Sequence, residues 1–274
     1  MRCVEAFQFI HDEIEHSRVL VTLMRKNGYL NWCNEFYQYH YVEYPFRVHS
    51  FFLLTDQDEI IGHIAFREAL VSLHQQGSCW CMHALIDKKH RNLSNFIYLV
   101  ANAQQFLENI GYKLIFAMPN QSAAAIYAKC LGWNDIGFVN FSLVSKVPSS
   151  ANKSERSLYF SKTEDWWRWR LRIDNEPGHV FQTFHWNGIS VSQLLYTASS
   201  STIMPHDLNN FTQNQPICLW DHNNYTNRAS WWSCRFMCKS LVDELDHSIL
   251  KIENWHVDMI DSDAFYCENV QIFE

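Results

Sequence analysis

Residues 113–133 read KLIFAMPNQSAAAIYAKCLGW, and this stretch decides the fold class. Its first residues form a short apolar run, which is typical of a buried strand. Pro119-Asn120 predicts a turn, and the residues after it predict a helix over 121–131 that Gly132 ends. A strand followed at once by a helix indicates an α/β protein.

The neighbouring sequence continues the alternation of strands and helices. Upstream, short apolar runs predict strands, and apolar residues at helical spacing predict one helix after them. Downstream, another apolar run predicts a further strand. In chain order we expect strands over 49–55, 59–66 and 79–86, a helix over 94–109, a strand over 113–118, the helix over 121–131 and a strand over 136–144.

The second half of the chain looks like a diverged copy of the first. Residues 180–186 and 189–196 predict a hairpin across Asn187-Gly188, and 230–245 predicts a helix. The small polar stretch from 146 reads KVPSSANKSERS, which is typical of a linker. We therefore expect two units, over 1–147 and 158–274, joined by a linker over 148–157.

The composition describes a packed globular protein. Hydrophobic residues make up 47% of the chain, so disorder is not expected over most of its length. A formal net charge of −7 argues against a nucleic-acid partner and against binding to an anionic membrane. The eight glycines form no G-x-G, G-x-S-x-G or P-loop pattern. The chain has 11 tryptophans, and since aromatic residues are enriched in protein interfaces, a homodimer is compatible with this composition.

The cysteines and the N-terminus favour a cytoplasmic protein. Residues 1–17 are acidic where a secretory signal would be basic and then apolar, and no uncharged stretch reaches the roughly 18 residues of a membrane span. Nine cysteines, an odd number, fit reduced thiols better than disulfides. Neither Cys79-x-Cys81-x-His83 nor Cys234-x3-Cys238 has the spacing of a zinc site, so we expect no metal.

The order of elements between about residues 50 and 145 resembles the Gcn5-related N-acetyltransferase (GNAT) superfamily. The most specific part is Asn120-x6-Tyr127-x4-Gly132-Trp133, which is similar to that family's N-x6-Y-x-K-x-x-G-F/W block with Lys129 in place. The resemblance implies a GNAT fold, with a mixed central sheet flanked by helices, in two tandem GNAT-like halves. It also implies acyl-CoA as the co-substrate.

The resemblance assigns roles to the matching residues. Tyr127 corresponds to the tyrosine that protonates the departing CoA thiolate, and Asn120 to the asparagine that hydrogen-bonds the CoA arm. The main chain of the strand over 83–86 would bind the pantetheine arm through Ala84, Leu85 and Ile86. The pyrophosphate would lie at the start of the helix over 94–109, against Arg91, Asn92, Ser94, Asn95 and Phe96.

The phosphate loop departs from the family's pattern. The usual R-x-x-G-x-G/A becomes Arg91-Asn92-Leu93-Ser94-Asn95-Phe96, with Ser94 where the first glycine belongs. An ordinary capped helix next to a solvated basic run is the alternative interpretation of this segment. Tyr127 taken alone would equally suit a helix core.

The general base stays open among several candidates. His83 lies on the central strand, and a histidine ordinarily titrates near neutral pH. Glu68, His74 and a chain of water molecules are alternatives, and a lone strand histidine also suits packing. An acceptor amine that is already partly neutral would need no dedicated base.

Within the superfamily, three further stretches resemble N-acyltransferases of bacterial polysaccharide gene clusters, several of which act on nucleotide-linked amino sugars. These stretches are YLNW from 29, WWRWR from 166 and IDSDAF from 260. The resemblance implies transfer of an acetyl or short hydroxyacyl group to a dTDP- or UDP-linked amino dideoxy sugar. Such an acceptor needs cations, aromatic stacking and carboxylates, for which the candidates are Trp169, Arg170, Asp261 and Asp263. The alternative interpretations of these residues are a buried aromatic anchor with exposed arginines, and a surface acidic turn. Two alternatives remain, which are an acyltransferase for a peptide or another small amine and a non-catalytic scaffold with this fold.

Overall fold

The computed structural model of the chain describes residues 1–72, 77–144, 158–161, 163, 165–166, 169, 180–186, 189–195, 217–220, 232–243 and 246–257. Within these residues, most strands join one large mixed sheet. In spatial order its strands are β1 (Arg2–Glu5), β2 (Val48–Leu54), β3 (Ile60–Glu68), β5 (Ser78–Ile86), β6 (Leu114–Ala117), β12 (Trp232–Ser240), β7 (Asn134–Val144), β11 (Ile217–Trp220), β10 (Ile189–Leu195) and β9 (Val180–Trp186).

Most described pairs in this sheet are antiparallel, while β5 runs parallel to β6 and β10 runs parallel to β11. A small second sheet has the order β13 (Trp255–His256), β8 (Leu158–Ser161) and β4 (Leu70–Val71).

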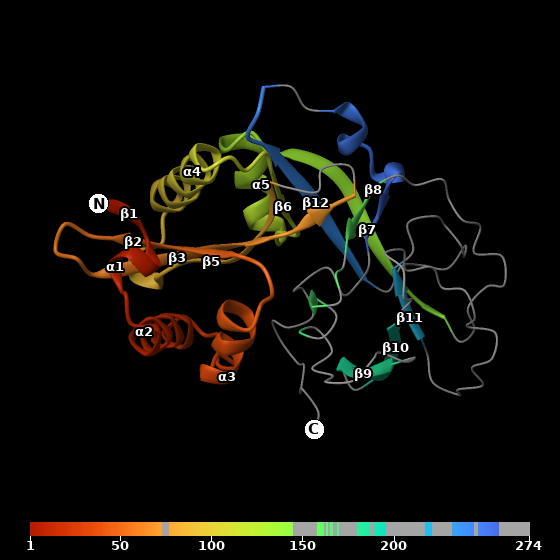
Figure 1. Ribbon diagram of the computed structural model, residues 1–274, viewed down its shortest axis with the longest axis horizontal. Coiled ribbons are helices and arrows are strands. Elements are labelled where there is room, and N and C mark those ends of the chain that lie inside the picture. The colour runs from red at the N-terminus through yellow and green to blue at the C-terminus, as the bar shows by residue number, and fades with distance from the viewer. Residues whose placement is uncertain are drawn as a thin grey trace.

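Helices cover both faces of the large sheet (Figure 1). In chain order they are α1 (Ala6–Phe9), α2 (Glu13–Lys26), α3 (Asn34–Tyr37), the π-helical turn η1 (Gln38–Val42), the 3₁₀ turn η2 (Lys88–His90), α4 (Leu93–Asn109), α5 (Gln121–Cys130), and the 3₁₀ turns η4 (His247–Leu250) and η5 (Ile252–Asn254). Among the described residues, none of these helices has the length and apolar character needed to cross a membrane.

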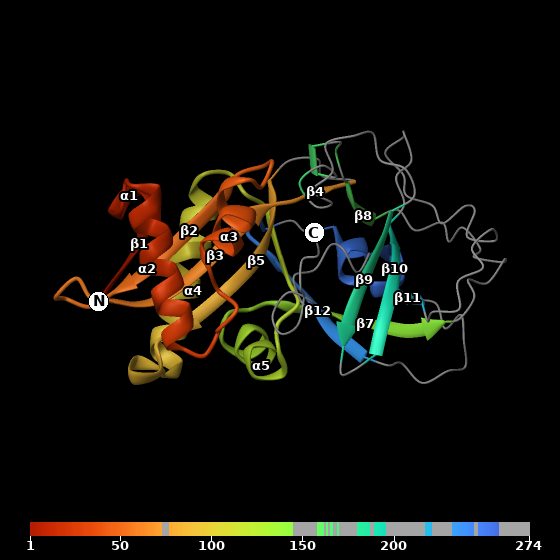
Figure 2. The same cartoon turned by 90° about the horizontal axis from the view of Figure 1, so that it is seen from below.

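Each face of the sheet has its own apolar core. On one face α4 and α5 pack with residues such as Leu99 and Tyr127 against the strands. On the other, α2 packs Leu20 and Met24 against β2 and β3, and Figure 2 shows α2 and α3 in front of these strands. The predicted α/β fold, with a mixed central sheet flanked by helices, is therefore confirmed.

The local elements of the first half follow the sequence pattern closely. The predicted helix over 94–109 is α4, and its N-cap is Asn92, whose side chain accepts a hydrogen bond from the Asn95 N–H group at 2.8 Å. The predicted helix over 121–131 is α5, capped in the same way by Asn120. The strands predicted over 49–55 and 59–66 pair antiparallel as β2 and β3, and in the second half the strands of the predicted hairpin pair as β9 and β10.

The helix predicted over 230–245 is wrong, because this segment forms strand β12. Cys234 and Phe236 are buried and Arg235 between them is partly exposed, which is the period of two of a strand. Met237 and Cys238 are both buried, next to the register shift between Phe236 and Met237 in the pairing with β7. The segment lies between β6 and β7 and pairs antiparallel with both, so its main-chain groups are hydrogen-bonded without helical turns (Figure 1). Long-range pairing has overridden local propensity here.

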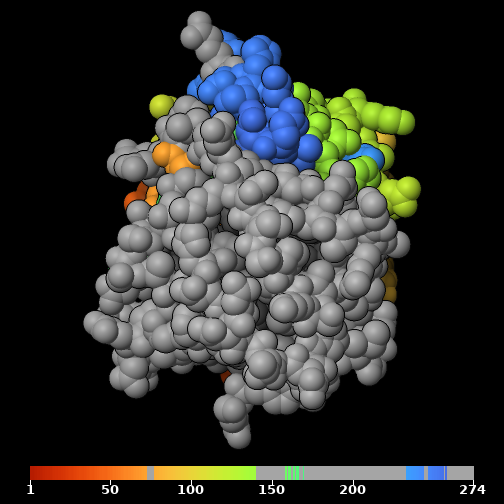
Figure 3. Space-filling model, turned by 90° about the vertical axis from the view of Figure 1, so that its right-hand side faces the viewer, coloured from red at the N-terminus to blue at the C-terminus, as the bar shows by residue number. Residues whose placement is uncertain are grey.

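Strand β12 joins the two halves of the chain. It belongs to the unit predicted over 158–274, yet it completes the sheet of the unit predicted over 1–147. The 3₁₀ turns after it also pack on β7, where Gly137 lies close to Ile252. In Figure 3 the blue atoms of this C-terminal segment lie directly against green atoms of the first half. The division into two units with a linker stays a prediction.

We predict that Phe236→Ala strongly destabilises the protein, because Phe236 is fully buried among Phe116, Phe160 and Trp255. The expected loss in the free energy of unfolding is about 3–5 kcal/mol, measured by urea denaturation. Phe138→Ala is the matched control, since this ring on the paired strand is 50% exposed and contacts Arg235. Its expected cost is about 1 kcal/mol or less. Equal losses in the two variants would contradict the packing of β12.

Candidate active site

A gap in main-chain pairing opens between β5 and β6. The two strands pair in parallel at Ser78, Cys79 and Trp80, and there the described pairing stops. β5 continues to Ile86 and stays paired with β3 on its other side. Within the described residues, the edge of β5 over 81–86 therefore has no strand partner on the β6 side. We call this gap the slot.

Beside the slot, β5 carries a β-bulge. His63 of β3 pairs with Leu85 and Ala65 pairs with Met82, so two residues of β5, His83 and Ala84, lie opposite one residue of β3. His83 has a φ of 53°, in the left-handed region. For a residue other than glycine such strain costs about 1–3 kcal/mol, and it persists only where the surroundings hold it.

The alternation along β5 decides which peptide groups face the slot. The Asp87 N–H group donates to the Ile61 carbonyl at 2.8 Å, so the peptide groups of Leu85, two residues earlier, also face β3. The groups of Ala84 and Ile86 then face the slot. Consistent with this, the Ile86 carbonyl accepts from Nε and Nη2 of Arg91, each at 3.3 Å. The pantetheine contacts at Ala84, Leu85 and Ile86 stay predictions, and Ala84 and Ile86 are the two whose peptide groups face the slot.

Tyr127 of α5 reaches the slot from the face that α4 covers. Its hydroxyl lies 3.4 Å from Sγ of Cys81, the first residue of β5 beyond the pairing with β6. The ring is stacked on Trp133 at 4.6 Å and on Phe96 at 5.8 Å, which fixes its direction. Burial, together with Cys81, raises the pKa of Tyr127 well above its usual value, so the phenol stays protonated. Burial also raises the pKa of Cys81 to about 12. The Tyr127 hydroxyl and the Cys81 thiol are therefore in hydrogen-bonding contact, in which either group can donate.

The basic loop after β5 is tied to the end of α2. The buried carboxylate of Asp87 lies 2.5 Å from Nζ of Lys26 and accepts the Lys89 N–H group at 3.0 Å. The Lys88 N–H group donates to the side chain of Asn27 at 2.8 Å. Burial acts to raise the pKa of Asp87. Lys26 and the Lys89 N–H group together lower this pKa by more than burial raises it, so the net shift is downward. The loop is held in place without glycine.

The start of α4 meets this loop at the end of β5. Asn95 and Phe96 already use their N–H groups inside the helix, toward the side chain and the carbonyl of Asn92. The first helical N–H groups, of Leu93 and Ser94, have no partner within the helix. Both residues are exposed. Of the predicted phosphate contacts within α4, Ser94 is the one whose N–H group has no helical partner, and the other such group belongs to Leu93, which was not predicted. The phosphate site stays a prediction.

His83 lies on the opposite face of the sheet from Tyr127, among aromatic side chains of α3 and its surroundings. Its Nδ1 is 2.9 Å from the hydroxyl of Tyr41, and its ring centroid is 4.8 Å from that of Trp32 and 5.8 Å from that of Phe36. The side chain is half-buried. Of the other bases considered, Glu68 ends β3 and its carbonyl accepts from Tyr44, while His74 lies outside the described residues.

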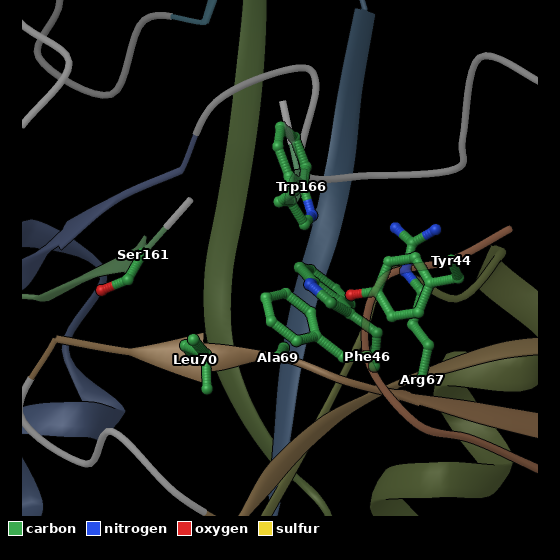
Figure 4. A pocket seen from close by; sticks show the side chains of 8 residues that line it. Tyr44, Phe46, Arg67, Ala69, Leu70, Ser161 and Trp166 are labelled. Carbon is green, nitrogen blue, oxygen red and sulfur yellow. The ribbon is translucent and has the colours of Figure 1, made fainter. Parts of the chain in front are cut away.

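Trp169 is a buried anchor beside this cluster. Its Nε1 donates to the Tyr39 carbonyl at 2.7 Å, and its ring is stacked on that of Tyr39. The buried Arg67 guanidinium lies 5.5 Å from the Trp169 ring and 5.3 Å from the Tyr44 ring. A hollow of about 10 Å³, room for one water molecule, opens here between Trp166, Tyr44 and Arg67 (Figure 4). The other predicted acceptor residues, Arg170, Asp261 and Asp263, lie outside the described residues.

Sequence reasoning missed three residues behind the bulge. His63 Nδ1 lies 3.0 Å from the carbonyl oxygen of His83, and Ser50 and His16 continue the contact inward. A signal was present, because Ser50 and His63 each interrupt an apolar strand. Cys81 was considered only as a metal ligand. Among the described residues no group of three or more His, Cys, Asp or Glu side chains could hold a metal ion.

Comparison with known proteins gives low similarity throughout. No family model matches the sequence, and no curated protein matches it. Among solved structures, the chain is similar to the GNAT family N-acetyltransferase YhbS from Escherichia coli in complex with CoA, at 17% identity and a TM-score of 0.34. That match covers 43% of this chain and 63% of the other, less than two thirds of its length.

Two further solved structures are similar at the same level. A GNAT family acetyltransferase from Brucella melitensis in complex with acetyl-CoA is 13% identical, with 48% of this chain and 82% of the other covered and a TM-score of 0.38. The ribosomal-protein-S18-alanine N-acetyltransferase from Escherichia coli is 13% identical, with 51% and 81% covered and a TM-score of 0.39.

We predict that Asp87→Asn destabilises the protein at pH 7 by about 1–3 kcal/mol, since a charge-assisted contact to Lys26 is lost. The pKa of Asp87 is lower in the folded than in the unfolded chain, so its contribution is present above the unfolded value. This stabilising contribution is lost as the pH falls through the pKa of Asp87 in the folded chain. The free energies of unfolding of wild type and variant should therefore become equal in acid. Urea unfolding at stepped pH measures this.

Glu59→Gln is the control for this experiment, because its carboxylate is exposed and lies 4.0 Å from His90. We expect a cost of about 0.5 kcal/mol or less at every pH. A difference between wild type and Asp87→Asn that stays constant into acid would contradict the charged anchor.

Proposed function

We propose that this protein is an acyl-CoA-dependent N-acyltransferase that transfers an acyl group directly to an amine. The observation that carries the proposal is the position of Tyr127, whose protonated hydroxyl lies 3.4 Å from the Cys81 thiol beside the slot. A phenol in this position can protonate a departing thiolate. The motif around Tyr127 supports the same reading from the sequence.

The residues present fit acyl-CoA at three places. The edge of β5 over 81–86 offers Ala84 and Ile86 to an extended pantetheine arm, which can pair with it as an added strand would. The N–H groups of Leu93 and Ser94 at the start of α4 suit a pyrophosphate. Lys88 and Lys89 beside them are exposed cations. The bound co-substrate supplies an acyl group activated as a thioester.

The chain's own groups would then act from the two sides of the slot. Tyr127 holds the proton that the leaving sulfur needs, and the stacked Trp133 and Phe96 keep its hydroxyl aimed at the slot. A peptide N–H group of β5 in the slot can donate to the thioester oxygen as negative charge develops there. His83, on the other face of the bulge, is the base we propose for the incoming amine.

For the acceptor we propose the amine of a dTDP- or UDP-linked amino dideoxy sugar used in surface polysaccharide synthesis, and for the donor an acetyl or short hydroxyacyl group. The support is the sequence resemblance of the YLNW, WWRWR and IDSDAF stretches. The first of these includes Trp32, which contacts His83, and the second includes Trp166 and Trp169, which lie beside Tyr44 and Arg67. Arg170, Asp261 and Asp263 remain proposed acceptor contacts, and two tandem halves remain the proposed organisation.

The first test is calorimetric titration of the purified protein with acetyl-CoA. We expect a Kd in the micromolar range, changed little by Ser94→Gly, because the amides of α4 and not the Ser94 side chain bind phosphate. Ser122→Gly is the matched control, since Ser122 has the same position after the cap in α5. If wild type does not bind acetyl-CoA and Ser94→Gly does, the protein is better described as a scaffold that has lost its co-substrate.

The second test measures turnover of acetyl-CoA. Tyr127→Phe should lower kcat about 10²- to 10⁴-fold and leave the Kd for acetyl-CoA nearly unchanged, because the proton donor alone is removed. Tyr98→Phe, at an exposed position on α4, should keep wild-type turnover. The acceptors compared are a nucleotide-linked amino sugar, the same sugar without nucleotide, and a dipeptide amine.

Of these three acceptors, we expect turnover of acetyl-CoA only with the nucleotide-linked amino sugar. Turnover with the dipeptide would instead favour a peptide or small-amine acyltransferase. Unchanged turnover in Tyr127→Phe would remove Tyr127 from the mechanism.

A further inference from the structure

A line of buried hydrogen bonds leads from α3 to the bulge in β5. Tyr37 Oη lies 2.7 Å from His16 Nδ1, His16 Nε2 lies 3.5 Å from Ser50 Oγ, Ser50 Oγ lies 3.0 Å from His63 Nε2, and His63 Nδ1 lies 3.0 Å from the carbonyl oxygen of His83. All four side chains are fully buried. We call Tyr37, His16, Ser50 and His63 the histidine chain.

The carbonyl at its end fixes the direction of the whole histidine chain. A carbonyl oxygen only accepts, so His63 Nδ1 carries the proton. In a neutral imidazole the other nitrogen then accepts, so Ser50 donates to His63 Nε2. The Ser50 oxygen in turn accepts from His16 Nε2, and His16 Nδ1 accepts from the hydroxyl of Tyr37. Every donor in the line has one acceptor, and all four hydrogen bonds run in the same direction, from Tyr37 to the His83 carbonyl.

Both imidazoles stay neutral at physiological pH, as this polarity requires. Burial lowers the pKa of His16 to about 4. Burial lowers the pKa of His63 well below its usual value, against a smaller rise from its bond to the His83 carbonyl. In a charged His63 both ring nitrogens would donate, so Ser50 Oγ would have to accept from His63 as well as from His16 and its own proton would lose its acceptor in the line.

The end of the histidine chain holds the strained residue of the bulge. His63 reaches from β3 to the carbonyl of His83, the residue with a φ of 53°. The direction of that carbonyl fixes the peptide plane between His83 and Ala84, and this plane contains the Ala84 N–H group. The direction of the Ala84 N–H group, a main-chain donor facing the slot, is therefore fixed by the His63 side chain, which does not itself enter the slot.

We propose that His63, supported by Ser50 and His16, is a positioning residue that aims the Ala84 N–H group at the acyl group in the slot. The inference rests on the proposed acyl transfer and assigns a specific role within it. A leucine at the same place would fill the core equally well, but it would leave the His83 carbonyl without its donor. In this proposal the three polar residues set the direction of the His83 carbonyl, which apolar side chains at the same places could not do.

The test compares His63→Leu with His63→Asn in the acetyl-CoA turnover assay. The asparagine amide nitrogen is as many bonds from the main chain as Nδ1 of histidine, so it can still donate to the His83 carbonyl. We expect His63→Leu to lower kcat about 10- to 100-fold with a Kd for acetyl-CoA within about threefold of wild type, and His63→Asn to recover most of the loss.

His49→Leu is the matched control for burial. His49 is a buried histidine on β2, bonded to Tyr112 at 3.2 Å and facing α4, outside the histidine chain. It should keep kcat within about twofold of wild type while costing comparable stability in urea. Equal losses of kcat in His63→Leu and His49→Leu would overturn the positioning role, and so would a folded His63→Asn as slow as His63→Leu.

A spectroscopic measurement separates this proposal from the proposed function. The ¹⁵N chemical shifts of the His63 ring should show a proton on Nδ1 and an acceptor at Nε2 in wild type, whether or not the protein turns over acetyl-CoA. A proton on Nε2 would overturn the histidine chain itself. Wild type with the expected shifts but no acyl transfer would overturn the proposed function, and with it the role of His63.

Discussion

Beyond Trp80 the peptide groups of β5 lose the strand that would pair with them, and a main-chain group without a partner costs about as much as a lost hydrogen bond. The structure meets this constraint separately at each position. The carbonyl of His83 turns to His63, that of Ile86 accepts from Arg91, and the peptide groups of Leu85 stay with β3. What remains directed at the slot is a short edge that suits an extended ligand.

The slot also needs a fixed far side, and β12 supplies it. β6 is four residues long and pairs with β5 at three positions, so β5 alone would hold it weakly. β12 pairs with all four residues of β6 and then with β7, and it contacts α5 as well. The direction of Tyr127 therefore depends on a strand that begins about a hundred residues later in the sequence.

The features that could be predicted from the sequence are those that neighbouring residues determine. The cap at Asn92, the apolar face of α4 and the N-x6-Y spacing are local, so the helices and the place of Tyr127 followed from them. The strand at 232–240 could not be predicted, because its two partners are distant in sequence and its own residues also suit a helix. The bulge at His83 was hidden for the same reason, since its cause lies on β3 and β2.

The place of β12 in the sheet has a consequence during synthesis of the chain. Residues up to 144 can fold their helices and the β2–β3–β5 meander as they emerge, but β6 and β7 must wait for residues 232–240 before they are joined. At about 5–20 residues per second the wait is on the order of 10 s. During that time the edges of β6 and β7 that β12 will cover are open to strands of other chains. Until the C-terminal segment arrives, the nascent chain is therefore open to pairing with strands of other chains.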